Sequence, residues 1–359
     1  MSALIRRKPL PLKGELPLIN PTGWTLDDGA GNQAQVWPAL GFNLISWKVN
    51  TAAGPIELIH RDPGLFEDGK GTRSGNPILF PFPNRIAAGR YQFEGNPYQL
   101  ELSGDGGKTA IHGFACRHPW RLLEASAENN ESWITAEFDL FRDGPGSRAQ
   151  WPKNGRLQMT YRLIAHGEFG VLRIEAKVDH EGPGNFPFGL GYHPYFSALP
   201  GWKTQVEVPA ASFWELDQCI PTGKKMPVDA SRNLNKPTAF DSLKLDDVLC
   251  DLPPNAPKRS SLPNRLQATQ TPEGQGTPEL LLRGRMIYPG KGELGLWCES
   301  HYREVVVYTP PSRDSFCIEP YTCPTNAINN ADGGIGAGWL VLQPGETWTS
   351  VNEWVFKRV

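Results

Sequence analysis

Two residues in this sequence combine a titratable side chain with a setting that favours proton transfer, and the first is His193. It lies within Phe186–Phe196, an aromatic segment interrupted by glycines and by Pro194. An imidazole takes up or releases a proton near neutral pH. Aromatic rings beside it offer a platform for an apolar ligand face, such as the C–H face of a sugar ring. A packed, hydrogen-bonded and inert histidine is the alternative interpretation of the same segment.

The second residue is Glu319, which follows the apolar run Phe316–Ile318 and precedes Pro320. A carboxyl group at the mouth of a buried strand loses solvation, which raises its pKa and makes it a better base. An edge glutamate paired with a cation would leave the same pattern. One carboxylate and one imidazole can together take a proton from the C1 hydroxyl of a sugar and give one to the ring oxygen, so the pair can interconvert anomers without a metal or cofactor.

A proline-rich loop carries two candidate binding residues, Asn84 and Arg85. Prolines at positions 77, 81 and 83 exclude both a helix and a central strand here. A stiff loop loses little entropy when its side chains bind a ligand, and the guanidinium offers a planar fork of donors. Arg85 is equally typical of a structural arginine that ties a loop to carbonyls or to a carboxylate.

Two weaker signals complete the set of candidate residues. His112 precedes Gly113, where the backbone can approach a ligand closely, although a surface or capping histidine is the commoner outcome. Asp246 and Asp247 form a pair in a polar stretch, and adjacent aspartates are usually solvated loop groups or helix caps. Spacing alone does not decide which of the two faces a ligand.

The elements that must position these residues are predicted to be short strands. The chain has 359 residues, of which 38 are glycine and 34 proline, and this content suits many strands joined by tight turns. Four antiparallel strands are expected between residues 120 and 180. We expect one all-β domain over residues 1–359, with an N-terminal arm over residues 1–20 and a long loop over Pro253–Gln275.

Charge and motif content exclude several classes of protein. With a net charge of −2, the protein has no strong electrostatic attraction for nucleic acid or for an anionic membrane. The six cysteines form no C-x-x-C pair and the histidines form no i, i+4 pair, so no metal site is expected. The sequence also contains no serine-nucleophile elbow. We expect reduced thiols and a cytoplasmic protein, because neither a secretory signal nor a membrane span is recognisable.

Taken together, the motifs resemble the aldose 1-epimerase (galactose mutarotase) family. They occur in the family's order over roughly residues 30–357: Asn-Pro-Ile-Leu-Phe-Pro with Asn84-Arg85-Ile, Ile-His112-Gly-Phe, Gly-Leu-Gly-Tyr-His193-Pro-Tyr-Phe, Leu-Asp246-Asp, Val-Tyr-Thr-Pro, Glu319-Pro, Asn-Ala-Ile-Asn and Leu-Gln-Pro-Gly-Glu.

This resemblance implies a large twisted antiparallel β-sandwich with a cleft on one face. It implies Glu319 as the base on the C1 hydroxyl and His193 as the acid on the ring oxygen. It also implies that Asn84, Arg85, His112 and Asp246 bind the hydroxyls of a small-molecule aldose. The wording after Glu319, Pro-Tyr-Thr-Cys-Pro-Thr, departs from the commonest pattern of the family, which bears on the choice of sugar.

Three alternatives to a free-hexose epimerase follow from the sequence. A hexose-6-phosphate epimerase would need a second cation, for which Arg73, Arg90 and Arg117 are available. A catalytically silent sugar-binding protein on the same fold is the second alternative, since fold alone does not define activity. A glycosidase is the third, although no pair of acidic motifs flanking a cleft is recognisable. The sequence does not predict the oligomeric state.

Overall fold

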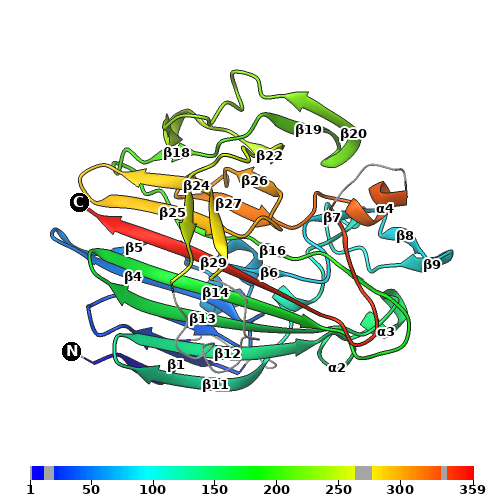
Figure 1. The fold of residues 1–359 in the computed structure, drawn as a ribbon, viewed down its shortest axis with the longest axis horizontal. Coiled ribbons are helices and arrows are strands. Elements are labelled where there is room, and N and C mark those ends of the chain that lie inside the picture. Colours follow the sequence, from blue (N-terminus) through cyan, green and yellow to red (C-terminus); the bar gives the residue numbers. More distant parts are fainter. Residues whose placement is uncertain (1, 12–19, 263–276, 333–337) are drawn as a thin grey trace.

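The structure is a computed structural model, and it describes residues 2–11, 20–262, 277–332 and 338–359. Strands dominate, and they pair antiparallel throughout the three large sheets (Figure 1). The predicted fold class, a large twisted antiparallel β-sandwich, is confirmed. Helices are short, and none in the described part of the chain combines the length and apolarity needed to cross a membrane. They are α1 (Leu65–Asp68), α2 (Leu140–Asp143), α3 (Ser147–Gln150) and α4 (Ala327–Asp332).

The largest sheet has ten strands, and its strands β11 to β14 and β29 lie in the lower half of Figure 1. Its order is β11 (Arg121–Glu128), β12 (Glu131–Asp139), β13 (Arg156–His166), β14 (Phe169–Asp179), β29 (Thr347–Arg358), β25 (Gly292–Cys298), β24 (Glu279–Tyr288), β18 (Gln205–Glu207) and β21 (Thr238–Ala239), with β23 (Lys258–Ser260) on β24. The four strands expected between residues 120 and 180 are β11 to β14. The strand β23 lies inside the predicted loop Pro253–Gln275, of which residues 263–275 lie outside the described residues.

The second sheet has eight strands and supplies Glu319 and Asp246 of the candidate site. Its order is β20 (Ile220–Pro227), β19 (Ser212–Asp217), β22 (Asp246–Cys250), β26 (Glu304–Tyr308), β27 (Ser315–Tyr321), β16 (Gly191–Tyr192) and β6 (Ile78–Leu79), with β17 (Tyr195–Ser197) also on β27. The strand β27 therefore occupies the centre of the sheet.

A five-stranded sheet begins the chain, in the order β1 (Leu4–Pro9), β2 (Thr22–Asp27), β3 (Gln33–Trp37), β4 (Asn43–Thr51) and β5 (Gly54–Glu57). Part of the predicted N-terminal arm is thus an edge strand, because Ile5 packs against the core and Leu4–Pro9 pairs with β2. Three two-stranded pairs complete the fold: β7 (Arg85–Ala87) with β10 (Thr109–Ile111), β8 (Arg90–Phe93) with β9 (Asn96–Gln99), and β15 (Phe186–Phe188) with β28 (Leu340–Leu342).

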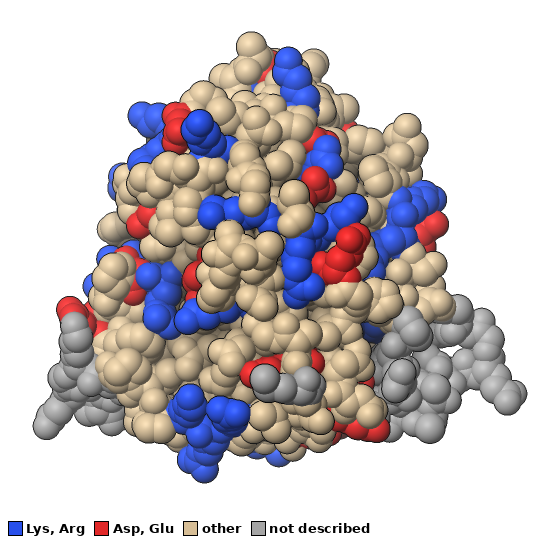
Figure 2. Space-filling view, turned by 90° about the vertical axis from the view of Figure 1, so that its left-hand side faces the viewer, with Lys and Arg blue, Asp and Glu red and all other residues tan. Residues whose placement is uncertain are grey.

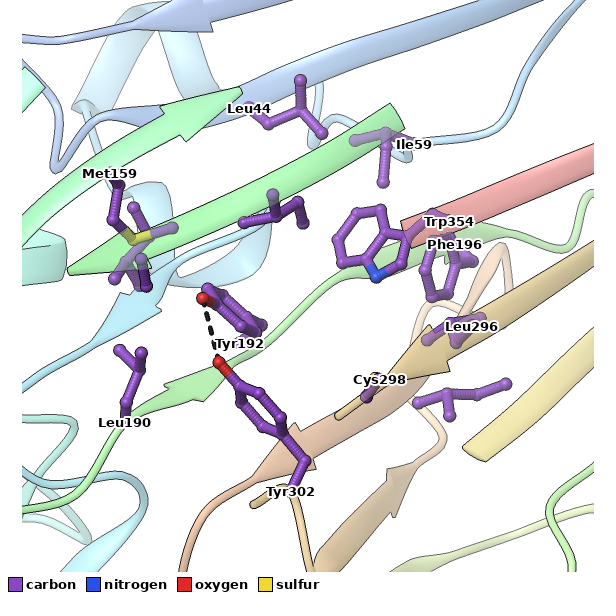
Figure 3. Packing of buried hydrophobic residues seen from close by; sticks show 14 of the residues in the cluster. Leu44, Ile59, Met159, Leu190, Tyr192, Phe196, Leu296, Cys298, Tyr302 and Trp354 are labelled. Carbon is purple, nitrogen blue, oxygen red and sulfur yellow. Dashed lines mark hydrogen bonds between the residues drawn. The ribbon is translucent and has the colours of Figure 1, made fainter. Parts of the chain in front are cut away.

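The hydrophobic core lies where the inner faces of the three large sheets meet. Side chains alternate between the two faces of a strand, so Met159 and Tyr161 of β13 both point into this core. Trp354 of β29 is fully buried, and its ring lies 5.2 Å from that of Phe196 and 6.5 Å from that of Trp47 (Figure 3). These three aromatic residues belong to three different sheets, so Trp354 helps to hold the layers together.

Charged side chains of both signs are interleaved on the end of the molecule that carries both termini (Figures 1 and 2). This mixed surface agrees with the net charge of −2 and offers no broad field of one sign on that face.

We expect Trp354→Ala to lower the free energy of unfolding by about 3–5 kcal/mol, because a large ring is removed from a close-packed interior. Trp354→Phe keeps most of the ring, and it also removes an indole N–H that has no hydrogen-bond partner, so its cost should be smaller. Urea unfolding followed by tryptophan fluorescence measures both; equal losses for the two variants would contradict the packing role.

Candidate active site

His193 and Glu319 are brought together by the register of strand pairing. The strand β27 pairs with β16 through Tyr321 and Gly191, and with β17 through Cys317 and Tyr195. In an antiparallel pair, residue 193 then falls opposite residue 319. Pro194 interrupts the ladder at this point because it has no N–H to donate. The His193 imidazole Nε2 lies 3.5 Å from Glu319 Oε1.

The His193 ring is held in place from several sides. Its backbone N–H donates to the Pro77 carbonyl at 3.0 Å. The Tyr195 ring stacks on the imidazole with centroids 4.7 Å apart and an interplanar angle of 10°, and the Tyr195 hydroxyl donates to the Thr72 carbonyl at 2.7 Å. The Tyr308 ring presents its edge at 6.3 Å. Aromatic rings therefore flank His193, as predicted. One of them, Tyr308, comes from β26, which is distant from His193 in the sequence.

The environment of Glu319 favours the uncharged form of its carboxyl group. It is 1% exposed, and this burial raises its pKa well above the ordinary value. The Tyr321 hydroxyl donates a hydrogen bond to Glu319 Oε2, which opposes the rise in the pKa; the nearby Asp246 carboxylate adds to it. Tyr321 lies two residues along β27, so both side chains project from the same face of the strand.

Burial acts in the opposite direction on His193. It disfavours the imidazolium and lowers the pKa of His193 to about 3, with the positive charge of Arg85 adding to the effect. The contact between His193 and Glu319 is therefore not an ion pair at neutral pH in the free protein. Burial thus favours the uncharged form of both groups.

The two loop residues Asn84 and Arg85 lie at the same cavity wall, and Arg85 is clamped by a carboxylate. Its Nε donates to Asp105 Oδ2 at 2.8 Å, its Nη2 to Asp105 Oδ1 at 3.1 Å, and its Nη1 to Asn84 Oδ1 at 2.9 Å. Arg85 is thus tied to a carboxylate, as its structural interpretation predicts, and it also lines the cavity; its role in binding stays a prediction. Asp105 carries no signal in the sequence beyond its glycine-rich turn.

His112 is placed beside the loop by backbone contacts. Its N–H donates to the Asn84 carbonyl at 2.8 Å, and its φ of 65° is in the left-handed region. Gly113 follows at φ 64°, and a Cβ there would lie 2.2 Å from the Phe80 carbonyl oxygen, so only glycine fits. The His112 ring lies 5.4 Å from that of His193, and burial lowers the pKa of His112 well below its ordinary value. It is therefore neutral at physiological pH.

The structure separates the two adjacent aspartates. Asp246 lines the cavity, whereas Asp247 turns away and its Oδ1 accepts from Arg232 Nε at 2.7 Å. The register of β22 with β26 places Asp246 opposite Tyr308, on the same face of the sheet as Glu319.

All six predicted residues border one cavity of about 320 Å³, which falls within the size range of small-molecule sites. Apart from Arg117, which was considered as a phosphate-binding cation, sequence reasoning did not single out the other lining residues, although Tyr195, Tyr308 and Tyr321 stand inside the motifs themselves. The residues that line this cavity are Thr72, Asn84, Arg85, Ser103, Gly104, Ile111, His112, Arg117, His193, Tyr195, Asp246, Val306, Tyr308, Glu319 and Tyr321.

The fold and this cavity define a β-sandwich protein with a polar, aromatic-walled small-molecule site. The chain belongs to the aldose 1-epimerase family, whose sequence model matches residues 23–353. It is 26% identical over 270 residues to the uncharacterized protein YihR of Escherichia coli, covering 75% of each chain.

Solved structures share the fold at low sequence identity. A galactose mutarotase-like protein from Clostridium acetobutylicum superposes with a TM-score of 0.78 at 17% identity, covering 100% of this chain and 99% of that one. A galactose 1-epimerase from Lactobacillus acidophilus gives 0.71 at 16% identity, covering 99% of each.

We expect His193 to remain neutral well below pH 6.5, because burial opposes its charged form and its pKa is lowered to about 3. Histidine-selective ¹⁵N NMR over a pH series measures this, with the His193 signals assigned by their absence in His193→Asn. A His193 titration midpoint near 6.5 would contradict the burial argument.

Proposed function

We propose that this protein is an aldose 1-epimerase that interconverts the α and β anomers of a free hexose such as glucose or galactose. The observation that carries the proposal is the 3.5 Å approach of the His193 imidazole to the Glu319 carboxyl group at the wall of a cavity of sugar-accepting size. The fold match to a galactose 1-epimerase of Lactobacillus acidophilus supports the reaction class. We further propose that the whole chain works as one domain in the cytoplasm.

In the proposed reaction, Glu319 takes the proton of the C1 hydroxyl while His193 gives a proton to the ring oxygen. The bond between C1 and the ring oxygen breaks, and C1 becomes an aldehyde. Rotation about C1–C2 presents the other face of the carbonyl. As the ring closes the two groups exchange roles: Glu319 returns its proton to the carbonyl oxygen, and His193 takes the proton back from the attacking hydroxyl. Each well-placed acid or base accelerates such a step by roughly 10²–10⁴-fold.

The cycle requires a carboxylate on Glu319 and a proton on His193. Because the two groups are 3.5 Å apart, a proton on the Glu319 carboxyl group can pass to the His193 imidazole, which produces the carboxylate base and the imidazolium acid. The Arg85 guanidinium and the Tyr321 hydroxyl both favour the carboxylate form of Glu319. Substrate hydroxyls bound by Asn84, His112 and Asp246 would leave C1 free to turn, because these side chains lie around the pair and not on it.

We expect Glu319→Gln to lower the rate of anomer interconversion by roughly 100-fold or more, because the amide cannot accept the hydroxyl proton while the shape of the site is kept. Polarimetry of freshly dissolved α-D-glucose or α-D-galactose measures the rate, and titration calorimetry measures sugar binding, which should persist.

A matched control for that substitution is Glu304→Gln. Glu304 is also buried, lies opposite Tyr321 in the register of β26 with β27, and burial raises its pKa to about 7. It accepts a hydrogen bond from Trp214 Nε1 at 3.1 Å and does not line the cavity, so its variant should keep full activity. Normal turnover in Glu319→Gln would refute the assignment, and sugar binding with no catalysis in the unmodified protein would favour the silent sugar-binding alternative.

A hexose-6-phosphate is the alternative substrate, and one observation favours it. Of the three arginines considered for a phosphate, Arg117 lines the same cavity as the catalytic pair. Its Nη2 donates to the Ile111 carbonyl at 2.9 Å, and it forms no ion pair with the described residues. Arg73 pairs with Asp68 at 2.6 Å, and Arg90 borders a separate cavity beside β8 and β9.

We expect Arg117→Ala to raise KM by less than about 3-fold for a free hexose, because a neutral sugar needs no second cation. For a 6-phosphorylated hexose the same change should raise KM by about 10-fold or more, since a charge-assisted contact is lost. A polarimetric panel of free and 6-phosphorylated aldoses decides between the two. Higher kcat/KM for the phosphorylated sugars would overturn the free-hexose assignment.

A further inference from the structure

A sulfur atom lies beside the catalytic pair. Cys317 is fully buried on β27, and it precedes Glu319 by two residues, so both side chains lie on the same face of the strand. One ligand atom from each of His193, Cys317 and Glu319 lies within 4.8 Å of the other two. Within residues 2–11, 20–262, 277–332 and 338–359, no other group of histidine, cysteine and acidic side chains meets that condition.

The spacing of these three atoms is close to that required by a tetrahedral zinc ion. Bonds of about 2.0–2.3 Å at the tetrahedral angle place neighbouring ligand atoms about 3.3–3.8 Å apart. The distance between His193 Nε2 and Glu319 Oε1, 3.5 Å, already matches. The other two separations are at most 4.8 Å, so they need to close by no more than roughly 1.3 Å to reach the same value, which side-chain rotations supply.

The chemistry of the three groups is that of a three-ligand site with one open position. Thiolate, imidazole and carboxylate are all ordinary zinc ligands, and the thiolate favours soft cations over magnesium or calcium. The His193 side chain is 10% exposed, and Nε2 is the ring nitrogen that faces Glu319. A buried cysteine alone needs no ligand; the approach of an imidazole nitrogen and a carboxyl oxygen to the same point is the independent feature.

We propose that Zn²⁺, or another thiophilic divalent cation, binds His193, Cys317 and Glu319 with its fourth position open to the cavity, and that it reversibly silences the catalytic pair. On binding, the cation replaces the thiol proton and the carboxyl proton and takes the lone pair of the neutral imidazole. His193 and Glu319 both line the cavity, so the cation and the sugar enter through the same opening and compete. The silencing rests on the proposed epimerase function, but the binding does not.

The binding is tested with Co²⁺ as a spectroscopic substitute for Zn²⁺. One equivalent should produce a thiolate-to-cobalt charge-transfer band and the intense visible absorption of four-coordinate cobalt, and Zn²⁺ should abolish both. Cys317→Ala should lack the charge-transfer band and bind at least 10-fold more weakly. Cys298→Ala is the matched control, because Cys298 is also a fully buried free cysteine but lies in the core on β25.

The absence of the band from the unmodified protein would overturn the proposal, as would its persistence in Cys317→Ala. Circular dichroism and thermal unfolding establish that both alanine variants are folded, and a Cys317→Ser variant repeats the test with a side chain closer in size if alanine does not fold.

The silencing is tested in the epimerase assay with added Zn²⁺. The unmodified protein and Cys298→Ala should lose activity at micromolar Zn²⁺ and regain it with EDTA, with sugar raising the inhibitory concentration. Cys317→Ala should keep its basal activity and need at least 10-fold more Zn²⁺. Equal sensitivity of both variants would overturn the inhibitory role. If no aldose is turned over at all, the proposed function fails while the cobalt spectrum still decides the metal site.

Discussion

The pairing of β27 with the two short strands β16 and β17 is the constraint on which the site depends. Gly191 faces Tyr321 and Tyr195 faces Cys317, so the intervening histidine has to face the intervening glutamate. A shift of one residue would turn one of the two side chains to the opposite face of the sheet. Hydrophobic residues on the core face of β27, such as Phe316 and Ile318, prevent that shift because they are fully buried.

Burial creates the chemistry of the pair as well as its geometry. It disfavours the charged forms of both groups, so the pKa of Glu319 rises and that of His193 falls. The positive charge of Arg85 and the Tyr321 hydroxyl oppose the rise in the pKa of Glu319.

Much of this arrangement follows from local sequence. Alternating apolar residues predict β11 to β14 closely, because such alternation has one low-energy solution when one face of a sheet is buried. A stiff loop is indicated by proline at positions 81 and 83. A position where the backbone can be approached closely is indicated by Gly113. The strand at Leu4–Pro9 was not predicted, because prolines around it suggested an arm and its pairing partner is found only in the folded molecule.

The sequence by itself determined the strand-rich class, the family resemblance and the identity of the six candidate site residues, because these depend on residue type and order along the chain. Tertiary structure alone decided that Asp246 and not Asp247 faces the cavity, that Asp105 clamps Arg85, and that Cys317 lies beside the pair. The physical reason is that strand register and long-range pairing place residues more than 100 positions apart within a few ångströms, and no local propensity encodes that distance.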